Sequence, residues 1–237
     1  MLTIHHLSVS QCERILWLCE ELGVDYKMIK YMRDPILSPE SLKSVPGNPL
    51  GQSPFVEDDG GVQLSESGAI VDYIIHKYGG GRLALKPDDP RYAEYLQWFH
   101  YSNGTLQPAM LDIMFVDGSG AGKDNPMRQM AYSRLDQRLK WIDEQLASNK
   151  YLAGDSLTAG DIMTVYSLTT QRYWGPQADL SPYKNIVRYL QDIAQRPAYQ
   201  KAMEKGDPEM QPLLSAKAPE KGLFEVGGVT SDIWKKK

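Results

Sequence analysis

The sequence predicts two domains of different fold class, a small mixed α/β domain followed by an all-helical domain. Strand-like and helix-like segments alternate over the first third of the 237-residue chain, and the strand signals then vanish. A polar segment with two prolines, residues 86–90, separates the two regions. The chain is long for a single compact core, and its length suits two domains. We therefore expect an N-terminal domain over 1–82, a linker over 83–90, a helical domain over 91–205 and a C-terminal extension over 206–237.

The first elements follow a β-α-β order. Residues 2–6 have the pattern of a short buried strand, and apolar residues at helical spacing then predict a helix over about 11–22. Gly23 is a plausible stop for this helix. Residues 26–31 alternate as a second strand, and 39–43 could form one helical turn. These segments predict the first part of a mixed sheet with helices packed on it.

A hairpin and a helix complete the predicted α/β domain. Residues 54–56 and 62–64 are short strand candidates, and the D-D-G-G sequence at 58–61 between them is a strong turn signal. A helix is predicted over 67–78, and the three glycines at 79–81 end it.

Helical periodicity dominates the rest of the chain. Residues 91–115 predict a helix that is bent by Pro108, and 127–147 form a clear amphipathic helix. Shorter helices are expected over 161–173, 183–194 and 198–205. The proline-containing extension over 206–237 is either a strap on the surface or a floppy end.

Composition excludes several classes of protein. Apolar residues make up 42% of the chain and charged residues 24%, which is typical of a globular protein. The net charge is −4 and the basic residues are spread along the chain, so we expect no nucleic-acid partner. No apolar run reaches the roughly 20 residues of a membrane helix. The strand that begins at residue 2 leaves no room for a signal peptide, and we expect a cytoplasmic protein.

The cysteines and histidines indicate neither a disulfide nor a metal site. Cys12 and Cys19 lie seven residues apart on one predicted helix, roughly 10 Å along its axis, which is too far for a disulfide. Free cysteines suit a reducing compartment. The four histidines have no other ligand at metal-binding spacing, and no phosphate-binding glycine motif is present. We therefore expect no metal and no nucleotide.

Ser10 lies where the first strand gives way to the first helix. Amide groups at a helix N-terminus are unpaired and partly positive, so a thiolate placed there is stabilised, and the Ser10 hydroxyl could donate one more hydrogen bond to it. A purely structural role also fits, because Ser10 and Glu13 have the S-x-x-E spacing of a capping box. Cys12 is a rival nucleophile, although its register with apolar Ile15 and Leu22 favours buried packing.

Two further segments could bind a ligand. A cis Ser53–Pro54 bond would turn the preceding main chain outward to pair with an extended peptide, but most X-Pro bonds are trans and the sequence leaves both open. At the next helix start, Ser67 and nearby amides could hold a carboxylate and Glu66 an ammonium group. The structural alternative is a serine N-cap beside a glutamate that matches the helix dipole. Asp161, in a T-x-x-D capping box, is interpreted as structural.

Taken in order, these motifs resemble the glutathione transferase family over roughly residues 1–205. The resemblance is carried by the strand-to-helix serine and by N-P-L-G-Q-S-P at 48–54, L-S-E-S-G-A-I at 64–70 and Y-L-A-G-D-S-L-T-A-G-D at 151–161. The first 23 residues, with H-H-L, R-I-L-W and E-E-L-G, are most similar to the fungal and bacterial branch that includes the yeast Gtt-one-type enzymes. The resemblance implies a thioredoxin-like N-terminal domain and an all-α helical-bundle C-terminal domain.

The resemblance also implies a role for each site residue. Ser10 matches the catalytic position whose hydroxyl faces the glutathione sulfur, with Ser8 and Cys12 as alternatives. Ser53, before Pro54, matches the residue whose main chain pairs with the cysteinyl unit. The other implied glutathione-binding residues are Glu66 and Ser67 at the γ-glutamyl end, and Gln52 and Lys43 toward the glycyl end.

The implied reaction joins glutathione, a co-substrate and not a permanently bound cofactor, to an apolar electrophile, and hydroperoxide reduction is a possible second activity. The electrophile is expected between the domains, against the first helix of the C-terminal domain. The candidate lining residues, each also consistent with ordinary helix packing, are Tyr101, Asn103, Gln107, Met110, Met114 and Tyr173.

Two alternatives use the same fold. A glutathione-dependent isomerase or biosynthetic enzyme would apply the same thiolate to a single metabolite. A binding or regulatory protein would keep the fold without turnover. In each case the family resemblance implies a two-fold homodimer.

Overall fold

A computed structural model describes all 237 residues and divides them into two compact units. The sheet unit comprises Met1–Ala84, Ala194–Pro212 and Leu223–Lys237. The helical unit comprises Leu85–Ile193 and Leu213–Gly222. The last helix, expected to belong with the helical domain, therefore groups with the sheet, and the C-terminal extension contributes to both units.

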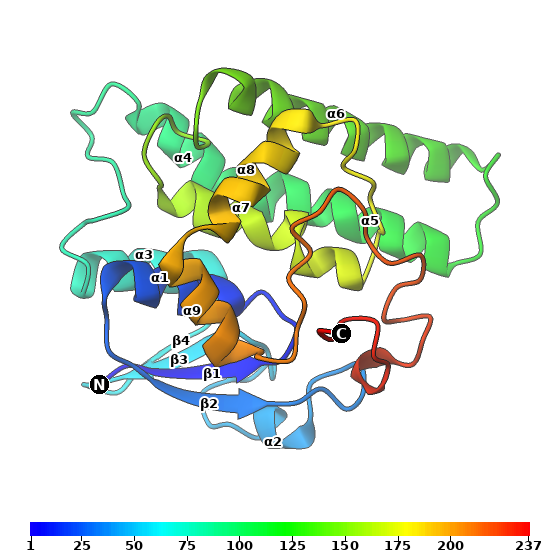
Figure 1. Cartoon of the computed structure of the whole chain (residues 1–237). Helices are drawn as coiled ribbons and strands as arrows, with labels where there is room; N and C mark the ends of the chain where they lie inside the picture. The colour runs from blue at the N-terminus through cyan, green and yellow to red at the C-terminus, as the bar shows by residue number, and fades with distance from the viewer. The chain divides into compact units, whose positions relative to one another are not determined.

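The sheet unit contains one four-stranded mixed sheet in the order β2-β1-β3-β4 (Figure 1). Its strands are β1 (Thr3–Leu7), β2 (Lys27–Tyr31), β3 (Phe55–Asp58) and β4 (Val62–Leu64). β1 pairs parallel with β2 and antiparallel with β3, and β3 forms an antiparallel hairpin with β4. The hairpin predicted from D-D-G-G is confirmed, and its two glycines have φ values of 82° and 78°, which favour glycine.

Helices cover the two faces of this sheet. α1 (Glu13–Leu22) and α3 (Ser67–Lys77) lie on one face and α2 (Glu40–Lys43) on the other (Figure 1). α9 (Pro197–Gly206) packs against α1, and a short turn, η3 (Gly228–Thr230), lies near the C-terminus. The parallel β1-α1-β2 unit brings the carboxyl end of β1 and the start of α1 together, where the candidate site begins.

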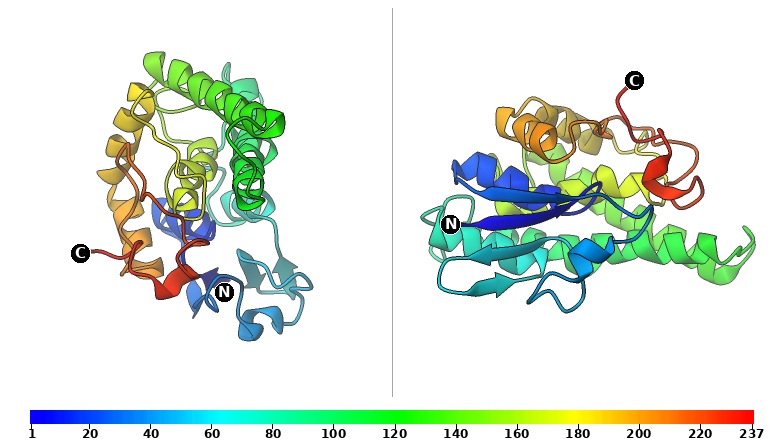
Figure 2. Two further views of the ribbon diagram at one scale, coloured as in Figure 1. Left: turned by 90° about the vertical axis from the view of Figure 1, so that its right-hand side faces the viewer. Right: turned by 90° about the horizontal axis from the view of Figure 1, so that it is seen from below.

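The helical unit contains no strand. Its elements are α4 (Tyr92–Tyr101), the π-helical turn η1 (Ser102–Leu106), α5 (Gln107–Gly118), α6 (Pro126–Ser148), α7 (Ala159–Leu168), η2 (Thr170–Tyr173) and α8 (Lys184–Ala194), whose last residue lies past the unit boundary. α5 and α6 lie side by side (Figure 2). None of the helices is both long and apolar enough to cross a bilayer.

The predicted bend at Pro108 takes a different form. The helix over 91–115 is interrupted by the π turn at 102–106, and Pro108 lies in the first turn of the helix that follows. Proline is tolerated there because its missing N–H would have no intrahelical partner anyway. The interruption was predicted, but it lies a few residues before Pro108 and takes the form of a π turn.

The capping box at the start of α7 is formed as expected. The Asp161 carboxylate accepts hydrogen bonds from the N–H groups of Leu152 at 2.9 Å and Thr158 at 2.8 Å, and from the Tyr189 hydroxyl at 3.0 Å. Burial raises the pKa of Asp161, although these hydrogen bonds oppose the shift. The residue is fully buried and holds its helix and the preceding loop together.

The C-terminal extension follows the surface-strap alternative. In the sheet unit, Gln211 N–H bonds to Trp234 C=O at 2.8 Å, and the Trp234 side chain is buried. In the helical unit, the buried guanidinium of Arg172 donates to the carbonyls of Ser215 at 3.0 Å and Ala216 at 2.7 Å. Each part of the extension is thus fixed by hydrogen bonds to its main chain.

Candidate functional site

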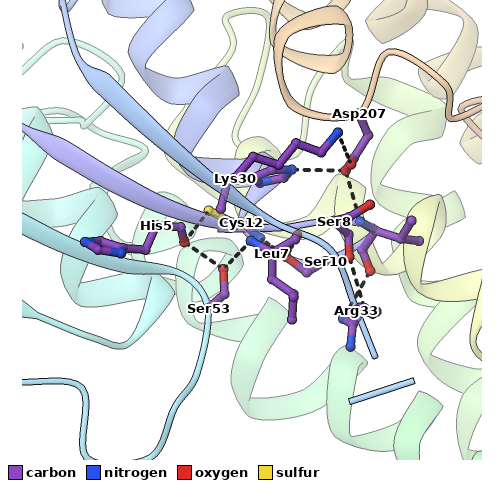
Figure 3. Close-up of polar contacts among 11 residues, drawn as sticks. His5, Leu7, Ser8, Ser10, Cys12, Lys30, Arg33, Ser53 and Asp207 are labelled. Carbon is purple, nitrogen blue, oxygen red and sulfur yellow. Dashed lines mark hydrogen bonds and ion pairs between the residues drawn. The ribbon is translucent and has the colours of Figure 1, made fainter. Parts of the chain in front are cut away.

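The site is built around the loop between β1 and α1. Ser8, Val9 and Ser10 form this loop, which we call the β1–α1 loop (Figure 3). Val9 has φ = 51°, in the left-handed region that a β-branched residue rarely adopts. The three residues are almost fully buried, with 0 to 4% of their surface exposed. A strained, buried conformation of this kind needs fixed partners.

The Ser10 hydroxyl is engaged by the main chain on both sides. It donates to Leu7 C=O at 2.6 Å and accepts from Cys12 N–H at 3.2 Å. Glu13 N–H bonds to Ser10 C=O instead of to the hydroxyl, so the expected capping box with Glu13 is not formed. A tight turn over residues 10–12 precedes the helix, and α1 begins two residues later than predicted.

The two alternatives to Ser10 lie deeper. The Cys12 thiol is fully buried and contacts His5 C=O at 3.6 Å. The Ser8 hydroxyl is also fully buried and has no hydrogen-bond partner. Both cysteines are free, as the sequence predicts. Ser10, at 4% exposed, is the most accessible of the three candidates.

Two charged side chains fix the main chain of the β1–α1 loop by hydrogen bonds. Asp207, directly after α9, accepts from Val9 N–H at 3.0 Å and from His6 Nε2 at 3.1 Å. Arg33 donates to the carbonyls of Ser8 at 2.9 Å and Val9 at 3.2 Å. Figure 3 shows the two charged residues on either side of the loop.

The buried His6–Asp207 pair is an ion pair. Burial alone would lower the pKa of His6, but the Asp207 carboxylate outweighs it and raises the pKa to about 10. Burial would likewise raise the pKa of Asp207, yet His6, Val9 N–H and the Lys30 charge hold it well below its usual range. Both shifts favour the charged form of the group concerned.

Ser53 presents its main chain at the edge of this site. Its hydroxyl donates to His5 C=O at 2.9 Å and accepts from Leu7 N–H at 3.0 Å, so the side chain replaces main-chain pairing with β1. The Ser53–Pro54 bond is cis, and no hydrogen bond within the protein engages Ser53 N–H or C=O. Asn48 fixes the neighbouring main chain by bonding to Gln52 N–H at 3.1 Å and Gln52 C=O at 2.8 Å.

The start of α3 provides a second polar position. Glu66 is exposed and has φ = 70°, while Ser67 begins the helix and is buried. The Ser67 hydroxyl accepts from the Arg14 guanidinium at 3.2 Å, and the same guanidinium nitrogen donates to Gln11 at 2.9 Å. The buried cation orients the serine hydroxyl at the helix N-terminus.

The sheet unit therefore contains all the residues expected to bind glutathione. Five of them lie next to strand ends and helix starts: Ser10 before α1, Ser53 and Pro54 before β3, and Glu66 and Ser67 at the start of α3. Gln52 is exposed beside Ser53, and Lys43 is exposed at the end of α2, where its side chain borders Gly51 and lies 3.8 Å from Glu40.

The expected co-substrate residues all belong to the helical unit, but they differ in burial. Tyr101, Met110 and Tyr173 are at most 5% exposed, so packing accounts for them. Tyr101 donates to Arg138 C=O at 3.2 Å, and burial raises the pKa of its hydroxyl to about 12. The half-buried candidates are Asn103, Gln107 and Met114.

Sequence reasoning missed three supporting residues. Asn48 lies inside the recognised 48–54 motif, so its position was a usable signal. Arg33 and Asp207 had none, because Arg33 lies in an irregular loop and Asp207 is about 200 residues from the loop that it contacts.

Comparison with known proteins identifies the family. The chain matches the model of the glutathione S-transferase N-terminal domain over residues 4–82 and that of the C-terminal domain over 99–197. It is 33% identical to glutathione S-transferase 3 of Schizosaccharomyces pombe, with 86% of this chain and 88% of the relative covered. It is 24% identical to glutathione S-transferase 1 of Saccharomyces cerevisiae, covering 86% and 95%.

Solved structures agree. A glutathione S-transferase from Actinobacillus pleuropneumoniae superposes with a TM-score of 0.78 at 28% identity, covering 87% of this chain and 93% of that one. A delta-class glutathione transferase from Nilaparvata lugens has a TM-score of 0.69 at 27% identity, covering 87% and 94%. The mixed sheet and the helical unit are thus those of one known family. This chain belongs to the glutathione S-transferase family.

Proposed function

We propose that this protein binds glutathione and promotes attack of its sulfur, as the thiolate, on an apolar electrophile. Family membership supports the reaction class. The observation that carries the proposal is the main chain of Ser53, whose N–H and C=O make no hydrogen bond within the protein while its side chain is fixed to β1. An extended peptide can pair with such a free main chain in the manner of an added strand.

The ends of the tripeptide have matching partners in this proposal. The γ-glutamyl carboxylate would lie at the N-terminus of α3, where Ser67 and the helix amides favour an anion. The exposed carboxylate of Glu66 would accept the ammonium group. Gln52 and Lys43 would contact the glycyl end, where a lysine charge complements the terminal carboxylate.

Ser10 is the proposed catalytic hydroxyl. A free thiol has a pKa near 8.5, and lowering it by two units corresponds to about 2.7 kcal/mol in favour of the thiolate. The start of α1 and one hydroxyl donor can supply energy of this order. In the free protein the hydroxyl donates to Leu7 C=O, so it would turn its proton toward sulfur when glutathione binds.

The thiolate would then form a carbon–sulfur bond, with loss of a leaving group from an aryl halide or protonation of the adduct from an enone. With a hydroperoxide, attack on oxygen would release the alcohol and leave a glutathione sulfenic acid, which a second glutathione would convert to the disulfide and water. Half-buried Gln107 and Met114 are the proposed residues of the helical unit for the electrophile, because thioether and amide side chains suit an adaptable site. We also propose a two-fold homodimer, on the strength of the family resemblance.

The test is turnover of aryl halides, enones and hydroperoxides with and without glutathione, together with calorimetric titration of glutathione. We expect glutathione-dependent turnover of at least one class. Ser67→Ala should weaken glutathione binding about tenfold with little change in kcat, because it removes a binding contact and not the sulfur donor. Absence of both binding and turnover would contradict the proposal, and binding without turnover would favour a regulatory role.

A further inference from the structure

The Asp207 carboxylate joins the C-terminal end of α9 to the β1–α1 loop. It is 4% exposed, and one of its oxygens, Oδ2, accepts from both Val9 N–H at 3.0 Å and His6 Nε2 at 3.1 Å. The other oxygen, Oδ1, lies 3.3 Å from the Lys30 ammonium group. Figure 3 shows these contacts converging on the carboxylate. A buried carboxylate with this many partners is held in one position.

The packing of α9 fixes where Asp207 can lie. A side chain at Gly206 would place its Cβ 2.7 Å from the Leu16 side chain and 3.3 Å from the His6 ring, so the glycine lets the helix end lie against α1 and β1 without displacing these side chains. Trp17 of α1 packs edge-on against Tyr199 of α9, with ring centroids 5.1 Å apart. These contacts bring Asp207 to the loop from a rigid element.

The main-chain conformation of Val9 needs such fixed neighbours. Its φ of 51° is unfavourable for a β-branched residue and persists only where neighbouring groups fix it. Asp207 holds its N–H and Arg33 holds its C=O, at 3.2 Å. Ser10 follows directly, so the direction of its N–H and hydroxyl depends on the conformation of Val9.

We propose that Asp207 is a positioning residue for thiolate formation, which it supports by holding Val9 N–H and thereby the orientation of Ser10. This role rests on the proposed function. The charged groups that face Asp207 are His6 of β1 and Lys30 of β2, and the Cys12 thiol of the turn before α1 faces His6. Asp207→Asn removes the same charge as Asp207→Ala but keeps an oxygen acceptor, so the comparison of the two variants separates geometry from charge.

The test compares Asp207→Ala with Asp207→Asn, because only asparagine keeps an oxygen that can accept from Val9 N–H. The readout is the ionisation of bound glutathione, followed by the ultraviolet absorbance of the thiolate as a function of pH, with kcat/KM measured in parallel. We expect Asp207→Ala to raise the ionisation midpoint by about one pH unit, which lowers the ratio of thiolate to thiol about tenfold at any given pH. Asp207→Asn should restore most of the thiolate. Should Asp207→Ala not fold, Asp207→Ser takes its place, because its shorter hydroxyl cannot span to Val9 and His6 together.

The matched control is Asp161→Ala in the helical unit, which removes another buried carboxylate, one that accepts from two main-chain N–H groups. It should lower the melting temperature without moving the ionisation midpoint. An unshifted midpoint in Asp207→Ala, or equal shifts in the alanine and asparagine variants, would overturn the positioning role. If wild-type protein forms no bound thiolate at any pH, the proposed function fails, and this role fails with it.

Discussion

The Ser10 hydroxyl has one proton, and in the free protein it donates that proton to Leu7 C=O. This explains why local sequence could not separate capping from chemistry: the same hydroxyl accepts from Cys12 N–H and lies at the helix start where a thiolate would be stabilised. The structure supplies what the sequence lacked, which is the deeper burial of Ser8 and Cys12.

Replacing Ser10 should therefore affect both activity and stability. We expect Ser10→Ala to lower kcat/KM at neutral pH by about 10- to 100-fold, the range of one hydrogen bond to a charged group, with glutathione affinity nearly unchanged. Loss of the bond to Cys12 N–H should also cost about 1 kcal/mol of stability. Steady-state kinetics and thermal unfolding measure the two effects. A silent Ser10→Ala together with an inactive Cys12→Ser or Ser8→Ala would show that the sulfur contact is assigned to the wrong residue.

The His6–Asp207 ion pair predicts a pH dependence of stability. The folded-state pKa of His6, about 10, lies above its unfolded value near 6.5, so its contribution is complete below about pH 6.5 and is lost as the pH rises through 10. Asp207 has a depressed pKa, so its contribution is present above about pH 4 and is lost in stronger acid. The difference in unfolding free energy between wild type and His6→Gln should be largest near pH 5 to 6 and shrink toward pH 10. Denaturant titrations across this range measure it, and a difference that grows with pH would be inconsistent with the ion pair.

Elements with strong local signals were predictable. The hairpin of β3 and β4 followed from the two glycines of its turn, and α7 followed from Thr158 and Asp161, because in both cases the deciding hydrogen bonds or dihedral angles lie within a few residues. The π turn at 102–106 was not predictable from local sequence, since both α4 and the turn itself pack against α7, which is distant in the sequence. The first turn of α1 was missed for a related reason, because the Ser10 hydroxyl took a partner other than Glu13 N–H.

The α7 capping box gives a prediction for one element. Asp161→Ala leaves the buried N–H groups of Leu152 and Thr158 without their acceptor, which should cost about 2 to 5 kcal/mol. Chemical denaturation measures the loss. The kcat of the remaining folded protein should be unchanged, because Asp161 belongs to the helical unit's core. A variant as stable as wild type would show that the two hydrogen bonds are dispensable.

At the scale of the whole molecule, the extension is where sequence reasoning was least informative. Its contacts join residues about 20 to 200 positions apart, such as Gln211 with Trp234 and His6 with Asp207, and no local pattern encodes them. The main positions of the site, Ser10, Ser53, Glu66 and Ser67, were named from the order of motifs along the chain. Arg33 and Asp207, which hold Ser8 and Val9 of the β1–α1 loop next to Ser10, were visible only in the folded structure.

The extension should contribute to stability through Trp234. This side chain is 1% exposed, and its indole N–H donates to Val229 C=O at 3.2 Å. Trp234→Ala should cost about 3 to 5 kcal/mol, the usual range for a buried large aromatic. Phe224, which is 47% exposed in the same segment, provides the matched control, and Phe224→Ala should cost well under half as much. Equal effects of the two substitutions in thermal unfolding would argue that the strap is not anchored by Trp234.

The central claim is that a tripeptide pairs with the Ser53 main chain and places its sulfur at the start of α1. A crystal structure with bound glutathione tests this most directly. We expect the cysteinyl N–H and C=O to bond to the main chain of Ser53, with the sulfur about 3.3 Å from Ser10 Oγ and the γ-glutamyl carboxylate at Ser67. Glutathione bound elsewhere, or a sulfur that contacts Cys12 or Ser8 instead of Ser10, would contradict the account.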